Sequence, residues 1–532
     1  MSDKRLKFYG WGSEGEGFTA EEDAFALVRY RERFGVDRFD EVAPPRLADI
    51  SLRAPRLKPP AALAALCSSE PHDRAQHTYG KSYPDYVRGL AGDYAAAPDV
   101  VAYPSTESEV AAVLDWAGSA EAVVTPFGGG SSVVGGVEPE VDGQRYKAAV
   151  TLDLRRMGKV KEVDKTSRAA RIEGGAFGPA LEAQLKPHGL TLRHFPQSFE
   201  YSTLGGWIAT RSGGHFATLM THIDDLVESL RVVTPAGTVE TRRLPGSGAG
   251  PSPDRLFIGS EGILGVITEA WMRLQDKPRF RAGGAVRFKD FFTAARALRV
   301  ISQAGLYPAN CRILDPQEAY NTGAGDGRAA IMVLAFESGD HPVDPWMKRA
   351  LEACADHGGT PESAERPDAH REGAAGLWRN AFIRMPYARE RMVPRAVIAD
   401  TFETAITWER FEAFHDKVKA ATEQAIRDAT GRPGQVTCRF THVYPDGPAP
   451  YFSFHALGRH GRLVEQWRAI KTAASDALIA AGGTITHHHA VGRDHRPWYD
   501  RQRPELFAAA LKAAKRALDP RGMLNPGVLI DP

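Results

Sequence analysis

PFGGGSSVVGG, residues 126–136, is the stretch that decides the fold of this chain. Its three consecutive glycines follow the apolar run AVVTP and precede two serines, and glycine lets backbone N–H groups wrap closely around a phosphate. The glycine spacing differs from the dinucleotide pattern G-x-G-x-x-G, and no Gly-Lys-Ser/Thr follows as in a Walker loop. The stretch is therefore either a flexible surface loop or the diphosphate loop of a less common cofactor domain.

Length and composition indicate a globular protein of several domains. At 532 residues the chain is too long for one core, so two or three domains are expected. The net charge of +1, with 43% apolar and 25% charged residues, leaves no electrostatic footprint for nucleic acid, and we expect no such partner. The four cysteines form no C-x-x-C pair, which is typical of buried thiols in a reducing compartment.

Targeting and membrane signals are not evident. The N-terminus MSDKRLKFYG lacks the apolar core of a signal peptide, and the C-terminal VLIDP is no peroxisomal address of the Ser-Lys-Leu type. No apolar run approaches the roughly 18–20 residues of a membrane-spanning helix. We therefore expect a cytoplasmic enzyme.

Shifts in pattern divide the chain into four segments. Between 91 and 277, strand-like runs such as AVVTP and AAVTLDL alternate with helical patterns, one of them opened by Thr106 and Glu109 as a capping box. The expected segments are an N-terminal strap over 1–90, a cofactor domain over 91–277, a substrate-binding cap over 278–500, and a C-terminal segment over 501–532 that returns to the cofactor domain.

Two further stretches in the same α/β region combine glycines with hydroxyl groups or apolar strand sequence. They are PQSFEYSTLGGWIATRSGG at 196–214 and GSEGILGVIT at 259–268. Each alone can be an ordinary turn. Three together suit a large cofactor lying in a groove of backbone donors, as an adenine dinucleotide with a flat apolar ring system would.

In this order and spacing, the three stretches resemble the FAD-binding PCMH-type domain of the vanillyl-alcohol-oxidase superfamily, and the chain is similar to the alkyldihydroxyacetonephosphate synthase family from FYGWG to LNPG. The resemblance implies an α+β fold, with a two-lobed FAD domain and a cap whose antiparallel sheet is flanked by helices. Serines stand where covalent members place a histidine, so non-covalent FAD is expected. The residues implied for FAD binding are Pro126, Phe127, Gly128, Gly129, Gly130, Ser131, Ser132, Gln197, Ser198, Ser202, Thr203, Thr210, Arg211, Ser212, Gly213, Glu261, Gly262, Ile263, Leu264, Gly265, Val266 and Ile267.

THHHAVG, residues 486–492, places three imidazoles side by side. In a strand at most two of them share a face. From the residues alone, an exposed polar loop is one option, and a zinc site with His495 as a further ligand is another, although contiguous ligands strain a tetrahedron. The family carries HHH-x-VG in its active site, so the resemblance implies catalytic roles for His488 and His489 and no metal.

A hairpin is predicted by the turn PDGP at 445–448. Alternation then places Tyr451 and Ser453 on one face of the return strand, and Phe452 and Phe454 on the other. Tyr451 falls at the position of the family's catalytic tyrosine, which exchanges a proton with a substrate carbon. Because a phenol has a pKa of about 10, we expect nearby cations, including the histidines, to favour its anion.

Three further residues acquire roles through the resemblance. Arg312 matches an arginine needed at the flavin, and His194 matches an active-site histidine. Arg389 matches the arginine that grips the substrate phosphate, where a guanidinium can bind two oxygens. Arg384 and Arg391 lie close by and are alternatives for that role.

The resemblance implies exchange of the acyl chain of acyl-dihydroxyacetone phosphate for a fatty alcohol, through an adduct at flavin N5, in ether-lipid synthesis. An FAD-dependent oxidase or dehydrogenase of a 2-hydroxy acid or another alcohol is the alternative, and a non-catalytic flavin-binding protein is a third. A lipid-like small-molecule substrate, peripheral membrane contact and a homodimer are also implied.

Overall fold

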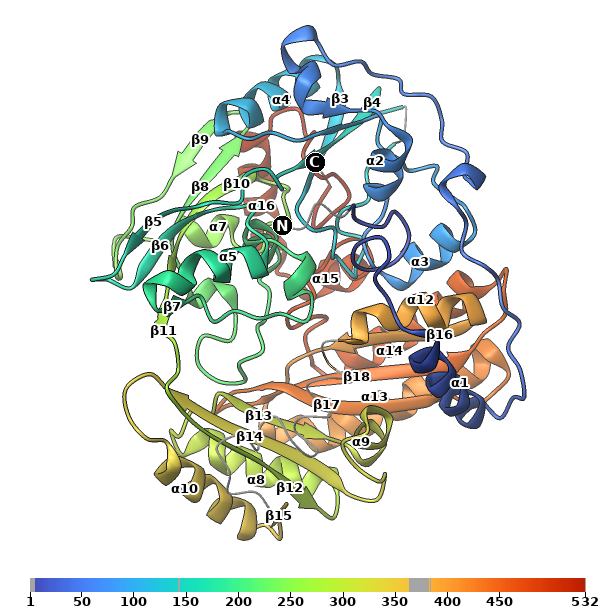
Figure 1. Cartoon of the computed structure of the whole chain (residues 1–532), viewed down its shortest axis with the longest axis vertical. Coiled ribbons are helices and arrows are strands. Elements are labelled where there is room, and N and C mark those ends of the chain that lie inside the picture. The colour runs from blue at the N-terminus through green and yellow to red at the C-terminus, as the bar shows by residue number, and fades with distance from the viewer. Residues whose placement is uncertain (1–4, 142–143, 363–381, 383, 532) are drawn as a thin grey trace.

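Three sheets organise the chain in the computed structural model, which describes residues 5–141, 144–362, 382 and 384–531 (Figure 1). The first sheet has the order β1-β2-β4-β3, with β2 and β3 parallel to β4. Both strand-like runs quoted above form strands here. The bounds are β1 Cys67–Ser68, β2 Val100–Ala102, β3 Ala122–Phe127 and β4 Ala148–Asp153. Thr106 caps helix α4 (Glu107–Ser119), and its hydroxyl accepts the Glu109 N–H.

The second sheet is antiparallel and has the order β5-β6-β10-β8-β9. Its strands are β5 Val160–Asp164, β6 Ala169–Glu173, β8 Val227–Thr234, β9 Gly237–Glu240 and β10 Val266–Arg273. Short helices α5 (Gly178–Leu185), α6 (Leu204–Thr210) and α7 (Asp254–Phe257) pack nearby, and β7 (Leu190–Thr191) pairs with β11 (Gln275–Asp276). The two sheets form the upper part of the molecule in Figure 1, as expected for a two-lobed FAD domain.

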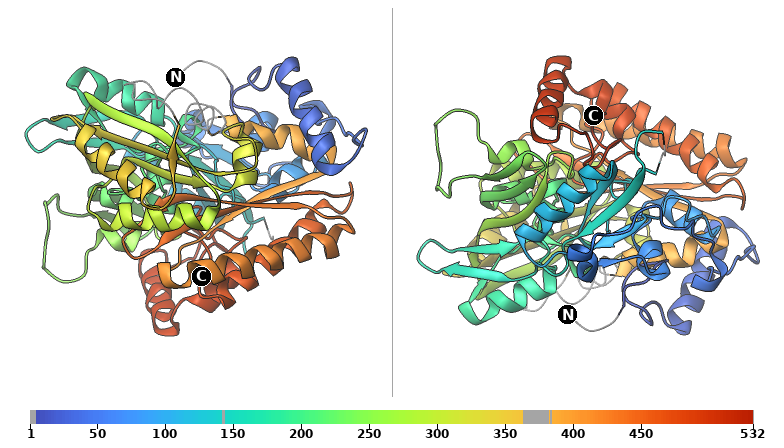
Figure 2. Two further views of the ribbon diagram at one scale, coloured as in Figure 1. Left: turned by 90° about the horizontal axis from the view of Figure 1, so that it is seen from below. Right: turned by 90° about the horizontal axis from the view of Figure 1, so that it is seen from above.

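The third sheet is antiparallel, seven-stranded and ordered β15-β12-β14-β13-β17-β18-β16. Its strands are β12 Phe280–Phe288, β13 Asn310–Leu314, β14 Ala330–Ser338, β15 Thr360–Pro361, β16 Val397–Glu403, β17 Gln435–Val443 and β18 Pro448–Leu457. Four helices cover one face and bury the largest core: α8 Phe291–Gln303, α10 Asp344–Ala355, α13 Trp408–Thr430 and α14 Leu463–Ala480. Figure 2 shows the long helices along one side of this sheet. The predicted α+β architecture is confirmed.

Alternation along β18 follows the prediction, because Phe452 and Phe454 point into that core whereas Tyr451 and Ser453 point to the opposite face. The opposite face of the sheet turns toward the first two sheets. The chemistry of the site is therefore carried by one face of a strand whose other face holds the fold together.

The two ends of the chain are tied to the other parts. Helix α1 (Ala20–Phe34) precedes the first sheet, and α2 (Pro71–Gln76) and α3 (Tyr83–Leu90) lie between β1 and β2 in the sequence. The last part of the chain forms α15 (Arg496–Gln502) and α16 (Glu505–Leu518). Beyond α16 the chain runs beside β3, where the Val124 N–H donates to the Met523 carbonyl at 2.9 Å. No helix in the described ranges is both long and apolar enough to cross a lipid bilayer.

Candidate active site

A cavity of about 640 Å³ joins the glycine-containing stretches to the open face of the seven-stranded sheet. Of the residues predicted to bind FAD, those that line it are Pro126, Phe127, Gly128, Gly129, Gly130, Ser131, Ser132, Gln197, Ser198, Ser202, Thr203, Thr210, Ser212, Gly213, Glu261, Gly262, Gly265, Val266 and Ile267. Of the predicted catalytic and substrate residues, Arg312, Arg389, Tyr451, His488 and His489 line the same cavity. The structure thus brings together groups that are up to 363 residues apart in the sequence, from Pro126 to His489.

Three residues predicted to bind FAD do not line the cavity. Ile263 and Leu264 are 1% and 0% exposed, because they point into the core behind the second sheet while the glycines on either side present backbone to the cavity. Arg211 forms an ion pair with Asp224 at 3.0 Å, and about half of its side chain is exposed. The side chains of these three residues thus do not face the cavity, and their part in binding FAD stays a prediction of the sequence.

His194 also lies behind the wall of the cavity instead of in it. Its ring packs 5.2 Å from the Trp207 ring, and its Nε2 lies 3.3 Å from the Ser212 hydroxyl, which does face the cavity. Burial lowers the pKa of His194 to about 3, so the imidazole is uncharged. His194 supports Ser212, and its catalytic role stays a prediction of the sequence.

The first glycine stretch fits a bound dinucleotide. A methyl group on Gly129 would lie 1.8 Å from the Tyr201 carbonyl oxygen, and one on Gly128 would lie 2.2 Å from the Thr203 hydroxyl, so only glycine allows this loop to pack against the second stretch. Within the described part of the chain, no backbone N–H of residues 128–132 donates to a protein acceptor. Backbone donors need partners, and this row of donors along the cavity suits a phosphate-bearing cofactor.

Tyr451 is enclosed on the cavity side of β18. Its hydroxyl donates to the Thr401 hydroxyl at 3.1 Å, and the Arg439 guanidinium lies 3.9 Å from the centre of its ring. Burial raises the pKa of the phenol, and the Arg439 charge opposes that rise without overcoming it. Tyr451 therefore keeps its proton in the resting protein.

His488 and His489 flank this phenol, with ring centres 6.1 and 5.4 Å from the Tyr451 ring. Burial lowers the pKa of both histidines well below the usual value, and neighbouring cations lower it further. Both imidazoles are uncharged at neutral pH. The expectation that they supply positive charge to a tyrosinate is wrong; Arg439 is the nearby cation, and the histidines are neutral proton acceptors.

Glu403, at the end of β16, shapes the histidine run. Its carboxylate accepts the Thr486 hydroxyl at 2.6 Å and the backbone N–H groups of His488 and His489 at 3.1 and 2.7 Å, together with that of His487. The run is consequently bent around one carboxylate instead of extended as a strand. Burial raises the pKa of Glu403 to about 7, against the hydrogen bonds that favour its anion.

Glu261, from the third glycine stretch, holds the other end of the same segment. Its carboxylate accepts the N–H groups of Val491 and Gly492 at 2.9 and 2.8 Å. Burial raises the pKa of this carboxyl group to about 7 as well. Residues 486–492 are therefore hydrogen-bonded at one end to Glu403 of the cap sheet and at the other end to Glu261 of the FAD domain.

The positively charged end of the cavity centres on Arg389. Its Nη2 lies 2.6 Å from an Asp400 carboxylate oxygen, and its Nη1 donates to the Lys81 carbonyl. The Lys81 side chain lines the cavity, and among the described residues its ammonium has no hydrogen bond or ion pair. Burial lowers the pKa of Lys81 to about 8, although Glu390 and Asp85 favour its charged form.

The two alternative arginines are engaged with acidic side chains of α1. Arg384 lies 3.1 Å from Glu22, and Arg391 lies 2.6 Å from Asp23. Arg312 is 1% exposed and donates to the His215 carbonyl at 3.0 Å. Among the predicted phosphate ligands, Arg389 contacts the backbone of Lys81, and both residues line the same cavity.

Sequence reasoning did not find Lys81, Glu403 or His442. Lys81 lies in the part treated as a strap, and nothing around Glu403 distinguishes it from a surface carboxylate. His442 shares a wall of the cavity because a β-bulge shifts the pairing of β17 with β18 between Phe440 and His442. Simple alternation would turn His442 away, so no sequence signal predicts its position.

Comparison with known proteins agrees with this geometry. Residues 98–242 match the family described as "FAD binding domain", and residues 277–529 match "FAD linked oxidases, C-terminal domain". The chain is 32% identical to the alkyldihydroxyacetonephosphate synthase of Dictyostelium discoideum over 480 residues, which cover 86% of this chain and 77% of that protein. The chain belongs to the alkyldihydroxyacetonephosphate synthase family.

A solved structure of an alkyldihydroxyacetonephosphate synthase superposes with a TM-score of 0.81 at 26% identity, over 98% of each chain. The glycolate oxidase subunit GlcD of Bacillus subtilis is a weaker relative, 26% identical over 83% of this chain and 91% of its own length. The protein is an FAD-linked enzyme, and FAD is its cofactor.

The close packing of Gly129 predicts the outcome of Gly129→Ala. The added methyl group collides with the Tyr201 carbonyl, so the loop must leave the second stretch, and the protein should lose FAD and melt at a lower temperature. Flavin absorbance after gel filtration and a thermal melt measure both effects. Gly284→Ala in β12 is the control, because its methyl group would lie 3.4 Å from the flexible end of Met347. Full FAD content in Gly129→Ala would contradict the argument.

Glu403→Gln tests the support of the histidine run. The amide NH₂ replaces an acceptor where four donors converge, and each unsatisfied buried donor costs about 1–3 kcal/mol. We expect a lower melting temperature and loss of turnover with FAD retained, measured by thermal melting and flavin absorbance. Glu409→Gln, at an exposed position in α13, is the matched control. Unchanged turnover in Glu403→Gln would refute a positioning role.

Proposed function

We propose that this chain is an FAD-dependent alkylglycerone-phosphate synthase, which exchanges the acyl chain of acyl-dihydroxyacetone phosphate for a fatty alcohol in ether-lipid synthesis. In this exchange the bond from the substrate C1 to the acyl oxygen breaks, a fatty acid leaves, and the alcohol oxygen takes its place. The observation that carries the proposal is the common cavity, whose lining includes the FAD loop, the Tyr451 phenol, two neutral histidines, and the cations Arg389 and Lys81.

Bound FAD would be held by the backbone of the three glycine stretches without a covalent link, and supplies a ring system that can accept electrons. The proton at the substrate C1 is moved by Tyr451. Burial keeps the phenol protonated, and its hydroxyl donates to Thr401 in the resting protein. Tyr451 can therefore take up the substrate C1 proton only if its own proton passes to a neutral acceptor nearby. His488 and His489, uncharged and held by Glu403, fit that role.

Binding of the substrate phosphate is assigned to Arg389 with Lys81. The Asp400 carboxylate is shared between Arg389 at 2.6 Å and Lys471 at 3.5 Å, so this region holds more positive than negative charge before Lys81 is counted. A phosphate dianion would compensate that excess, and it would also give the Lys81 ammonium the partner that burial demands.

The lipid chain is assigned to the side of the cavity lined by α1. Phe25, Ala26, Tyr30 and Met392 face it there. Phe25 is 64% exposed and Val28, on the same helix, is 53% exposed. Apolar side chains that face both the cavity and the solvent support peripheral membrane contact at α1, through which a lipid substrate would enter. The homodimer, the cytoplasmic location and the domain boundaries remain predictions of the sequence.

A second candidate is an FAD-linked oxidase or dehydrogenase of a 2-hydroxy acid. The match to the FAD-linked oxidase C-terminal family and the similarity to a glycolate oxidase subunit favour it. The two functions differ in electron balance, because a synthase transfers no net electrons whereas an oxidase leaves its flavin reduced.

Turnover separates the candidates. The purified protein, given palmitoyl-dihydroxyacetone phosphate and hexadecanol, should form the ether product detected by mass spectrometry, and Tyr451→Phe should abolish at least about 99% of it, the loss expected for one proton-transfer group, while retaining FAD. Tyr307→Phe, at a half-exposed position outside the cavity, should retain full activity. Rapid flavin bleaching by a hydroxy acid with no ether product would establish the oxidase instead.

The Lys81 charge predicts a pH dependence. Without bound substrate, Lys81 has a pKa of about 8. Its ammonium group is therefore present below that pH and is lost as the pH rises through it. The kcat/KM for the phosphorylated substrate should therefore fall between pH 7 and pH 9. Lys81→Arg should flatten this fall, because a guanidinium keeps its charge, and Lys81→Met should raise KM about tenfold at pH 7, the loss of roughly one charged hydrogen bond.

Lys289→Met is the control for this measurement, because the Lys289 side chain is 79% exposed and lies outside the cavity. A profile in Lys81→Met that falls as in the unaltered protein would remove Lys81 from the phosphate site.

A further inference from the structure

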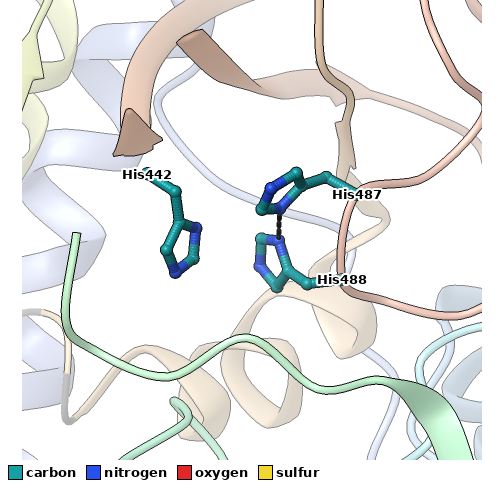
Figure 3. A group of neighbouring side chains, drawn as sticks. All are labelled: His442, His487 and His488. Atoms are coloured by element: carbon teal, nitrogen blue, oxygen red, sulfur yellow. Dashed lines mark hydrogen bonds between the residues drawn. The ribbon is translucent and has the colours of Figure 1, made fainter. Parts of the chain in front are cut away.

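Three histidines meet at one wall of the cavity. One ring nitrogen each of His442, His487 and His488 lies within 4.8 Å of the other two, and the Nδ1 atoms of His487 and His488 are 3.0 Å apart (Figure 3). His442 comes from the bulged end of β17, and the other two come from the segment bent around Glu403. The three rings therefore come from two separately supported pieces of backbone, one that carries His442 and one that carries both His487 and His488.

The outward nitrogens of two of these rings already have oxygen partners. His442 Nε2 lies 2.9 Å from the Gly214 carbonyl, and since a carbonyl only accepts, Nε2 carries the proton. Nδ1 therefore presents a lone pair, which lies 3.1 Å from the Thr441 hydroxyl, and an ion would take the place of that hydroxyl as its partner. His487 Nε2 lies 2.8 Å from the Tyr444 hydroxyl. Histidines that bind metals show this arrangement, with the second ring nitrogen tied to an oxygen that fixes tautomer and ring orientation.

We propose that Nδ1 of His442, His487 and His488 together bind one divalent transition-metal ion of the Zn²⁺ type. Zinc takes histidine nitrogens at 2.0–2.1 Å, which places two ligands of a tetrahedron about 3.4 Å apart. The observed spacing of 3.0 Å between one pair, and of at most 4.8 Å overall, is reached from that value by small ring rotations.

A zinc site in this arrangement does not need three contiguous histidines as ligands. Three contiguous ligands would strain a tetrahedron, but only two of the run are used here and β17 supplies the third. His489 points to Glu403, 3.5 Å from its carboxylate, and His495 bonds to the Ala490 carbonyl at 3.0 Å, so neither belongs to the group.

Charge around the site acts in both directions. The Glu403 carboxylate lies 3.7 Å from His488 Nδ1 and offers a counter-charge to a dication. Arg312 and Arg439 lie near enough to lower the pKa of these histidines, and they oppose the ion. Because His442 and His488 also line the cavity, the fourth position of the ion faces it, as in sites that leave one place for water or a substrate oxygen.

The test uses untagged, FAD-loaded protein, dialysed against a chelator and titrated with Zn²⁺ by calorimetry. One ion per chain is expected, with a rise in melting temperature, because a ligand that binds only the folded state stabilises it. His442→Gln and His488→Gln should each weaken binding by more than the about 10- to 100-fold that an outer-shell hydrogen bond contributes. His489→Gln, next in sequence but outside the group, is the matched control and should bind as the unaltered protein does.

Flavin absorbance shows that each variant is folded. X-ray absorption at the zinc edge of the unaltered protein gives an independent readout, with histidine nitrogens expected at about 2.0–2.1 Å. The proposal is overturned if no ion binds at unit stoichiometry, if His442→Gln binds Zn²⁺ unchanged, or if His489→Gln loses binding as fully as His442→Gln. None of these outcomes depends on ether formation, so the metal site and the proposed function stand or fall separately.

Discussion

Two buried carboxylates decide the shape of the active site. Glu403 and Glu261 accept six hydrogen bonds from residues 486–492, five of them from backbone N–H groups. One carboxylate belongs to the seven-stranded sheet and the other to a glycine stretch of the FAD domain, so the segment between them fixes how the two parts meet. Burial raises the pKa of both groups to about 7, because it disfavours the charged form of a carboxyl group. The hydrogen bonds from the segment are what offset that cost.

Burial also sets the charge state of the catalytic groups. In water two protonated histidines would favour the anion of a neighbouring tyrosine, but here desolvation raises the pKa of Tyr451 and lowers that of His488 and His489. All three side chains are neutral, and the charge in the site resides on arginines and Lys81. Proton transfer between these neutral partners would create a pair of opposite charges, so it needs fixed charges nearby that stabilise the developing anion, as Arg439 beside the Tyr451 ring can.

The sequence carries enough information for the sheets and the FAD loop, because both rest on local rules. Alternation correctly predicts that Tyr451 and Phe452 lie on opposite faces of their strand. The glycines at 128–130 indicate that the backbone is closely approached there, as it is by Tyr201 and Thr203. Contacts between residues far apart in the chain cannot be predicted from such local rules. Ile263 follows Gly262, which lines the cavity, yet its side chain points into a core. No residue near Glu403 in the sequence indicates that its carboxylate binds residues 486–489. His442 needed a bulge, which no pattern of side chains in this strand reveals.

The two proposals meet at His488, and the geometry lets them coexist. The His488 ring stacks on the Tyr451 ring at an interplanar angle of 29°, so it faces the phenol with its flat surface, whereas an ion at Nδ1 would lie in the plane of the imidazole. An ion bound there would therefore fix the orientation of the ring without coming between it and Tyr451. It would also compete for the lone pair by which His488 accepts a proton, leaving His489 as the neutral acceptor beside the phenol. The three adjacent histidines would then have different roles. His487 and His488 would bind the ion, and His489, whose backbone N–H donates to the same Glu403 carboxylate, would accept the proton.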